Sequence, residues 1–203
     1  MIIIRGFLFA LLALTLQGCI TLSPQDQKSN SPEYYSALTL SDQQLLSDES
    51  LFNHAGYRIK NYRAPVPSIA PYATTLSTAE LQQAIKEDEV LLIDVLPTPF
   101  RAGKFIDTAD HKNIPNSNWL PNTGKGVLDP FTSAYFAKKL HELTAGNRQH
   151  KLVFYCKTDC WMSWNACRRA AEEGYQNILW YSEGIDGWQK AGLPLVSAQS
   201  IQP

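Results

Sequence analysis

The sequence lacks a concentration of charge of either sign. Its 18 lysine and arginine residues and 19 aspartate and glutamate residues leave a formal net charge of -1. The basic residues are scattered along the chain instead of forming a stripe. Nucleic-acid-binding proteins carry a basic patch that meets the phosphate backbone. We therefore exclude nucleic acid as a partner.

Cysteine is scarce too, with four residues in a chain of 203. No second cysteine pair and no closely spaced histidine pair accompanies Cys156 and Cys160, so the ligands of a tetrahedral zinc or copper site are not complete. A small group of potential ligands, Asp107, Asp110 and His111, fits a solvated loop better than a metal site. We expect no bound metal and no other cofactor.

The apolar segment near the start of the chain falls short of a membrane span. It runs from Phe7 to Leu16, follows one early cation at Arg5, and stops just before Gly18 and Cys19. A transmembrane helix needs about 20 apolar residues. A short apolar segment between a cation and a small residue is typical of an export signal, which we place at residues 1–18.

The end of this segment, Leu16-Gln17-Gly18-Cys19, resembles the lipobox of bacterial lipoproteins. In those proteins the cysteine receives a diacylglycerol and becomes the new N-terminus, so the resemblance implies lipidation at Cys19. Gln17 departs from the usual small or β-branched residue, and a plain secretory signal with an incidental cysteine is the alternative. No aspartate follows Cys19, which by the same resemblance implies the outer membrane, facing the periplasm.

Two further segments precede the regular part of the chain. Residues 19–50 are rich in Ser, Gln, Asn and Asp and lack aliphatic periodicity, which is typical of a flexible tether. Residues 51–76 are dense in proline, which argues against a long helix, but they include Tyr57 and Tyr62. We expect these aromatic residues to hold the second segment against the domain.

Strand and helix patterns alternate over residues 77–198. Ser77-Thr78-Ala79-Glu80 is a capping box that predicts the start of a helix, ending near residues 87–89. Apolar runs with β-branched residues predict buried strands at 90–95, 152–155 and 178–181. Helical spacing predicts further helices at 131–143, 162–173 and 187–191, the second of them capped by Gly174. This alternation predicts one α/β domain with a mostly parallel sheet, right-handed crossovers and flanking helices.

Cys156 lies between the predicted strand 152–155 and a short polar loop that leads into a helix. Open α/β sheets bind ligands beyond the carboxyl ends of their strands. Loop N–H groups and a helix N-terminus form a cradle for anions there, and the same field lowers the pKa of a thiol. The pattern predicts a reactive Cys156, with an inert buried cysteine as the alternative.

Four pieces of the sequence, in order over Ser77 to Val196, resemble the rhodanese superfamily: VLLIDVLP, NIPNSNWLP, LVFYC and GYQNILWYSEGIDGWQKAGLPLV. The resemblance implies a single rhodanese-like domain in which Cys156 carries sulfur as a persulfide. CKTDCW, GYRIKNYRAPVP and CWMSWNACRRA further resemble the rhodanese-like Cys-Trp (CxxxCW) motif proteins associated with pyrroloquinoline-quinone-dependent catabolism. That narrower resemblance implies a quinoprotein dehydrogenase system as a partner.

The loop after Cys156 departs from the family pattern. It consists of Lys157, Thr158, Asp159, Cys160, Trp161 and Met162. Rhodaneses that use thiosulfate usually carry cations in this loop, and related cysteine phosphatases need an arginine where this chain has Met162. We therefore expect no phosphatase activity and poor thiosulfate turnover. Core packing is the ordinary role of Trp161 and its neighbour Trp164, and a Trp161 that walls the pocket entrance is the alternative.

Three other residues complete the candidate site. Cys160 lies four residues after Cys156. It is a candidate resolving thiol, because attack on an oxidised or persulfidated Cys156 would form a disulfide, which an exported location allows to persist. A coincidental loop cysteine is the alternative. We expect Cys167 to pack within its helix, and Asp94, at a strand end, either to cap the next loop or to orient the site.

These features support one hypothesis and one alternative. The hypothesis is a lipid-anchored periplasmic protein that transfers sulfur or performs thiol redox chemistry through Cys156 and Cys160. Its partner would be a small sulfur compound or a thiol of another protein. The alternative is a non-catalytic accessory, or a metal- or ligand-binding protein, of a quinoprotein alcohol dehydrogenase system.

Overall fold

The structure is a computed structural model, and it describes residues 32–87, 90–108 and 110–203. The predicted export signal at residues 1–18 and the predicted lipidation site at Cys19 lie outside the described residues. Within those ranges, no helix is both long enough and apolar enough to cross a membrane.

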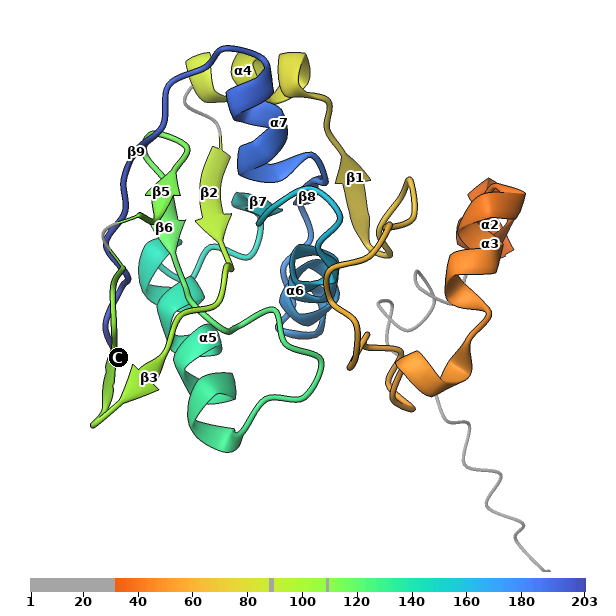
Figure 1. The fold of residues 1–203 in the computed structure, drawn as a ribbon, viewed down its shortest axis with the longest axis horizontal. Coiled ribbons are helices and arrows are strands. Elements are labelled where there is room, and N and C mark those ends of the chain that lie inside the picture. The colour runs from red at the N-terminus through yellow and green to blue at the C-terminus, as the bar shows by residue number, and fades with distance from the viewer. Residues whose placement is uncertain (1–31, 88–89, 109) are drawn as a thin grey trace, which may run out of the picture.

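A five-stranded parallel sheet forms the centre of the fold (Figure 1). The strands, in spatial order, are β1 (Ala73–Thr75), β8 (Ile178–Tyr181), β7 (Lys151–Tyr155), β2 (Val90–Asp94) and β6 (Asn118–Trp119). The interior residues of β2 and β7 are almost wholly buried, because helices cover both faces of a parallel sheet. The predicted mostly parallel sheet is confirmed. The pattern missed β1 and β6, which are too short to show a period.

Helices cover the sheet on both faces. They are α4 (Thr78–Lys86), α5 (Pro130–Leu143), α6 (Trp161–Glu172) and α7 (Gly184–Lys190). The chain crosses the sheet in one direction through α4 and returns through α5 and α6. Right-handed crossovers therefore place α4 and α7 on one face and α5 and α6 on the other (Figure 1).

The predicted helix ends are confirmed where local chemistry sets them. The Ser77 side chain accepts a hydrogen bond from the Glu80 N–H, and the Glu80 carboxylate accepts one from the Ser77 N–H at 2.8 Å. At the C-terminal end of α6, Gly174 has φ +91°, a conformation that favours glycine.

Two small antiparallel pairs lie beside the main sheet. One is the hairpin of β3 (Phe100–Arg101) with β4 (Lys104–Phe105). The other joins β5 (Lys112–Asn113) to β9 (Val196–Ser197), close to the end of the chain. The second pair ties the C-terminal residues back to the segment that follows β4.

Residues 32–50 differ from the expected tether. They contain the helices α2 (Pro32–Ala37) and α3 (Leu40–Leu46), followed by the 3-10 helix η1 (Glu49–Leu51). Asp42 in α3 is only 3% exposed, and its carboxylate accepts hydrogen bonds from the N–H and hydroxyl of Ser68, each at 2.7 Å. These helices are held by polar contacts and not by regularly spaced aliphatic residues, so the sequence pattern does not indicate them. Residues 19–31 lie outside the described part.

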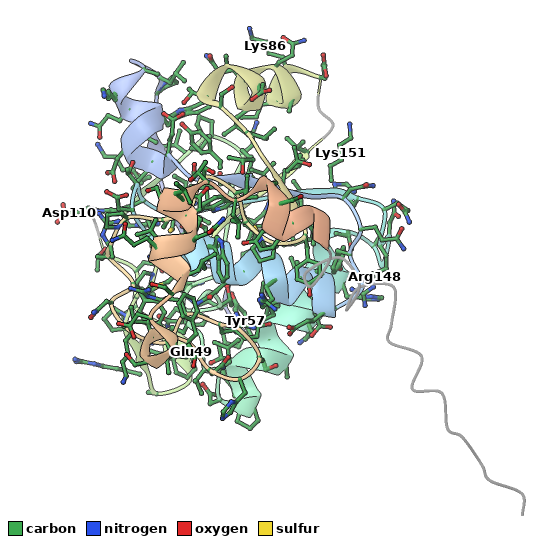
Figure 2. The ribbon with its side chains drawn as sticks, turned by 90° about the vertical axis from the view of Figure 1, so that its right-hand side faces the viewer. Glu49, Tyr57, Lys86, Asp110, Arg148 and Lys151 are labelled. Atoms are coloured by element: carbon green, nitrogen blue, oxygen red, sulfur yellow. The ribbon has the colours of Figure 1, made fainter. Side chains whose placement is uncertain are left out.

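The proline-dense segment, residues 51–76, lies along α6. Asn165 of α6 accepts a hydrogen bond from the Arg58 N–H at 2.9 Å and donates one to the Arg58 carbonyl at 2.9 Å. The Trp164 indole donates to the Ile69 carbonyl at 3.3 Å. Figure 2 faces this side of the molecule, where the helices of residues 32–51 lie across the front and Tyr57 is labelled just above Glu49. The segment is therefore a covering layer on the helix that follows Cys156.

Candidate active site

The first half of the Cys156 loop is bound to α7. The Cys156 carbonyl accepts a hydrogen bond from the Ile185 N–H at 2.9 Å. Thr158 donates its N–H to the Asp186 carboxylate at 3.1 Å and its hydroxyl to the Glu183 carbonyl at 2.6 Å. The start of α7 therefore fixes where β7 ends and the loop begins.

Gly184 makes this close approach between α7 and the loop feasible. Its φ is +58°, and a Cβ at this position would lie 2.4 Å from the Cys156 carbonyl oxygen. Real Cβ atoms do not approach backbone atoms so closely, and other residues rarely adopt this φ. The glycine is therefore required both by its conformation and by the space available.

A different element covers the second half of the loop. We call residues 61–66 the cover segment. Its Ala64 N–H donates to the Asp159 carbonyl at 3.1 Å, and the Trp161 N–H donates to the Tyr62 carbonyl at 2.9 Å. Arg63 lies opposite Cys160 in an antiparallel bridge. The Trp161 N–H is thus hydrogen-bonded to the cover segment and is not free to bind an anion in the loop.

The surroundings of Trp161 decide between its two expected roles. The side chain is 0% exposed, and its indole N–H donates to the Pro65 carbonyl at 3.0 Å. The Arg58 guanidinium lies 4.5 Å from the ring centroid, and the Phe52 and Trp164 rings meet it edge-on at 5.6 and 5.3 Å. Trp161 is core packing beneath the cover segment. Met162 and Trp164 are buried as well, at 8% and 2% exposed.

The structure brings Cys156 and Cys160 together. Both are free thiols and both are buried, at 0% and 2% exposed. The Cys156 Sγ lies 3.3 Å from the Cys160 carbonyl oxygen and 3.4 Å from the Ser163 hydroxyl. Cys167 is a buried free thiol within α6, as the packing prediction expected. The predicted pair is therefore in contact, and the third cysteine is not in the loop.

The two thiols of the pair titrate differently. A hydrogen bond from the Cys156 thiol lowers the pKa of Cys160 to about 7, with further support from the backbone of Met162 and Lys157 and from the Arg63 charge. Burial raises the pKa of Cys156 well above its usual value. Two interacting thiols release their protons as a pair, so the first thiolate forms on Cys160. The direction at Cys156 is opposite to the one that the loop pattern led us to expect.

Asp94 caps the next loop, the first of the two roles expected of it. It is 0% exposed, and its carboxylate accepts hydrogen bonds from the Leu96 N–H at 2.8 Å and from His111 Nε2 at 2.9 Å. The His111 ring stacks on Trp119 with centroids 3.8 Å apart. Burial raises the pKa of Asp94, while His111 acts in the opposite direction. Asp94 thus caps the loop after β2 and orients a histidine.

The potential ligands Asp107, Asp110 and His111 do not converge. His111 pairs with Asp94, and Asp107 accepts hydrogen bonds from the Ser200 backbone and hydroxyl. Asp110 is exposed, and Figure 2 shows it at the edge of the molecule. Over the ranges that the structure describes, no group of three or more His, Cys, Asp or Glu side chains is placed to hold a metal.

A polar pocket of about 420 Å³ lies beside the loop, on the α7 side. Its lining comprises Asp110, His111, Lys112, Lys157, Ile185, Asp186, Gln189, Leu193 and Leu195. Lys157 is the residue through which the loop reaches this pocket, and neither Cys156 nor Cys160 is part of the described lining. A ligand in this pocket would therefore contact the outer side of the loop and would not reach the sulfur atoms of Cys156 and Cys160.

The comparisons with known proteins agree with this fold. The family model of the rhodanese-like domain matches residues 77–191, and the chain belongs to that family. A thiosulfate sulfurtransferase, GlpE, of Actinobacillus succinogenes is 46% identical over 33 residues, which span 16% of this chain and 30% of that protein. The cover segment lies before the first residue that the family model matches.

Solved structures are also similar to this chain, at low sequence identity. A thiosulfate sulfurtransferase from Pseudomonas aeruginosa is 18% identical, with a TM-score of 0.45, over 64% of this chain and 21% of that one. The polysulfide-sulfur transferase homodimer from Wolinella succinogenes is 20% identical, with a TM-score of 0.40, over 63% of this chain and 81% of that one.

Sequence reasoning missed three contributors to the site. Arg63 and Tyr62 come from a segment about a hundred residues earlier in the chain, and only the fold brings them onto the loop. Ser163 sits one turn into α6, where it accepts a hydrogen bond from the Trp180 indole at 3.0 Å. The available signal was the Tyr-Arg-Ala-Pro run, whose proline favours an extended segment.

Proposed function

We propose that the chain is a rhodanese-type sulfurtransferase or thiol redox protein in which Cys156 and Cys160 act as a pair. The observation that carries this proposal is that Cys156 and Cys160 are both free and buried in the loop at the carboxyl end of β7, where the Cys156 Sγ lies 3.3 Å from the Cys160 carbonyl oxygen. A single reactive thiol can carry sulfur, but a second thiol within reach adds a route to release it. The family membership of residues 77–191 supports the same chemistry.

The titration order suggests how the pair works. The Cys160 thiolate accepts the proton of the neighbouring Cys156 thiol, and the Cys156 sulfur then attacks the outer sulfur of a donor such as thiosulfate. The donor's S–S bond breaks, sulfite leaves, and Cys156 holds a persulfide. An acceptor thiolate or cyanide then removes the outer sulfur. Alternatively, Cys160 loses its proton and attacks the inner sulfur of the persulfide, which forms the Cys156–Cys160 disulfide and releases hydrosulfide.

The buried loop narrows the substrate class. Both thiols are almost wholly covered, and the loop carries Lys157 and Asp159 where thiosulfate-using relatives usually carry more positive charge. Thiosulfate carries a sulfonate group that this loop has few cations to hold, whereas polysulfide, or the persulfide of a partner protein that displaces the cover segment, presents sulfur without sulfonate oxygens. We therefore propose polysulfide or a partner persulfide as a better donor than thiosulfate.

A sulfur-transfer assay tests the proposal. The reduced full chain is supplied with thiosulfate or polysulfide, and thiocyanate is measured after cyanide is added. We expect turnover with polysulfide that Cys156→Ser abolishes and Cys167→Ser leaves unchanged, because Cys167 is a buried packing residue of α6. Absence of thiocyanate with both donors, in a protein whose fold is intact, would exclude sulfur transfer to cyanide.

We also propose that the protein is anchored by lipid at Cys19, on the periplasmic face of the outer membrane. The support is the lipobox-like sequence Leu16-Gln17-Gly18-Cys19, which ends a short apolar segment. Several acyl chains, at about 0.8 kcal/mol per buried methylene, would hold the protein firmly. Membrane fractionation of cells that express the full chain should place it with the outer membrane, and Cys19→Ser should release it. A soluble wild-type protein would contradict the anchor.

One observation favours a second candidate function. Because Cys156 is 0% exposed, the domain could serve as a non-catalytic accessory of a quinoprotein alcohol dehydrogenase system, as the Cys-Trp motif resemblance suggests. Growth on alcohols separates the two. Growth that survives Cys156→Ser but fails when the whole chain is deleted would favour the accessory function, and growth lost in both would favour thiol chemistry.

A further inference from the structure

The loop between Cys156 and α6 supplies one cation of its own, Lys157. That side chain lines the pocket on the α7 side, together with Asp110 and Asp186, and its charge acts on the buried Asp94. Lys157 therefore faces away from the half of the loop that holds Cys160. A thiolate at Cys160 needs a positive charge from elsewhere.

Arg63 of the cover segment is placed to provide that charge. The antiparallel bridge sets Arg63 directly opposite Cys160. The Arg63 guanidinium extends along the loop, where its Nη1 donates a hydrogen bond to the Thr158 carbonyl at 2.7 Å. Backbone and side chain thus fix Arg63 to the loop at two separate residues.

The neighbours of Arg63 hold it in this place. Tyr62 accepts a hydrogen bond at its hydroxyl from the Gly126 N–H at 2.9 Å, and Pro65 accepts one at its carbonyl from the Trp161 indole at 3.0 Å. A guanidinium on a segment fixed at both ends loses less conformational freedom when it acts than one on a free loop. The placement of Arg63 is therefore built into the fold.

Among the residues that the structure describes, none forms an ion pair with Arg63. The ion pairs in the described part of the chain join His111 to Asp94, and Lys138 and Lys139 to Glu142. Arg63 bonds instead to a backbone carbonyl. An unpaired cation retains its full effect on a nearby anion, reduced only by solvent and salt.

We infer that Arg63 is a positioning residue for the Cys156–Cys160 site and supplies, from outside the matched family domain, the cation that this half of the loop lacks. The inference deepens the proposed function and rests on it, because it names the cation that stabilises the Cys160 thiolate used in that function. The charged side chains on the loop and on the elements packed against it are Arg63, Lys157, Asp159 and Asp186, with Arg58 against the Trp161 ring. Of these, Arg63 is the cation whose backbone is paired with Cys160.

A pH titration of the thiolate tests the inference. Ultraviolet absorbance of the thiolate needs no reagent to reach the buried sulfur, and a Cys160→Ser partner of each variant identifies the Cys160 signal. In Arg63→Gln the titration midpoint should rise by about 0.5 to 1 unit, the size expected when a partly exposed cation near an anion is lost. Arg63→Lys should stay close to wild type, because it keeps the charge.

Arg101→Gln is the matched control, because Arg101 is also exposed but lies in the β3–β4 hairpin. It should leave the midpoint unchanged. An Arg63→Gln midpoint equal to that of wild type would overturn the inference, and so would an equal shift in Arg63→Lys, which would trace the effect to local structure and not to charge. Thermal unfolding of each variant shows whether the fold is intact.

The titration and the sulfur-transfer assay test separate claims, so either claim can fail while the other holds. A shifted midpoint in Arg63→Gln without thiocyanate from the wild type would leave Arg63 as the cation of a thiolate with some other use. Turnover in the wild type with an unshifted midpoint would keep the proposed function and remove Arg63 from it.

Discussion

The two sides of the Cys156 loop are held in different ways. On one side, α7 binds the loop through the Ile185 N–H and through Thr158, and both partners lie within the family match of residues 77–191. On the other side, the cover segment binds Asp159 and Trp161 from outside that match. The first contact belongs to the domain, and the second is an addition that lies against the half of the loop containing Cys160.

The contrast separates two properties of Cys156 and Cys160, their position in the fold and their exposure to reagents. The position of Cys156 after β7 is set by the domain fold, whereas we expect access to the two buried thiols to depend on the cover segment, which is paired with Cys160. Local opening of a segment held by a few hydrogen bonds costs less than unfolding of the core. A site that is closed in the folded state can therefore still react when the cover segment leaves.

The largest effect is expected on the α7 side. Gly184→Ala should lower the free energy of unfolding by about 2 to 4 kcal/mol, because the new Cβ would meet the Cys156 carbonyl in a left-handed conformation. Gly103→Ala is the control, since Gly103 has φ +77° and no atom within 4 Å of its Cβ position. It should cost only about 1 kcal/mol. Equal losses in denaturant unfolding would show that the α7 contact does not constrain the loop.

An intermediate effect is expected on the cover side. Trp161→Phe removes the indole that binds Pro65 and should raise the rate of Cys160 alkylation about tenfold, the equivalent of about 1.4 kcal/mol in the opening of the cover segment. Trp188→Phe is the matched control, because Trp188 donates to the Pro194 carbonyl at 2.9 Å, far from the cover segment in sequence. Its cysteine reactivity should stay at the wild-type value. A similar increase in both variants would point to general loosening.

The sequence pattern predicts much of the domain but only part of the site. The helices after Ser77, Asp129 and Cys160 and the long strands are long enough to show a period or a cap. The two thiols were paired from their spacing alone. We expected residues 51–76 to pack on the domain, but the contacts of the cover segment with the loop could not be predicted, and neither could α3. Backbone carbonyls and polar side chains such as Asp42 form these contacts, which leave no hydrophobic period.

The smallest effect concerns Asp94, which supports the domain side of the site. Burial raises its pKa from 3.8, so the folded chain keeps this proton to a higher pH than the unfolded chain does. Stability should therefore fall as pH rises through that window. Asp94→Asn does not titrate, and its unfolding free energy, measured by denaturant between about pH 4 and pH 7, should lack this fall.

Asp129→Asn gives the opposite control. Hydrogen bonds from Thr132 lower the pKa of Asp129, so its contribution to stability is present above the ordinary carboxyl pKa and is lost as pH falls. Asp129→Asn should therefore be less stable than the wild type mainly above the ordinary carboxyl pKa, and the difference should shrink as pH falls. An Asp94→Asn curve parallel to that of the wild type would show that buried Asp94 has an ordinary pKa.

The central claim is that Cys156 and Cys160 work as one pair beneath the cover segment. Mass spectrometry of the peptide that contains both residues, after reduced full chain has reacted with polysulfide and been alkylated, tests it most directly. We predict a Cys156–Cys160 disulfide in the wild type and a persulfide on Cys156 in Cys160→Ser, where no resolving thiol remains. Alkylated thiols without added sulfur, at both positions in the wild type and at Cys156 in Cys160→Ser, under conditions that persulfidate a sulfurtransferase of known activity, would contradict the claim.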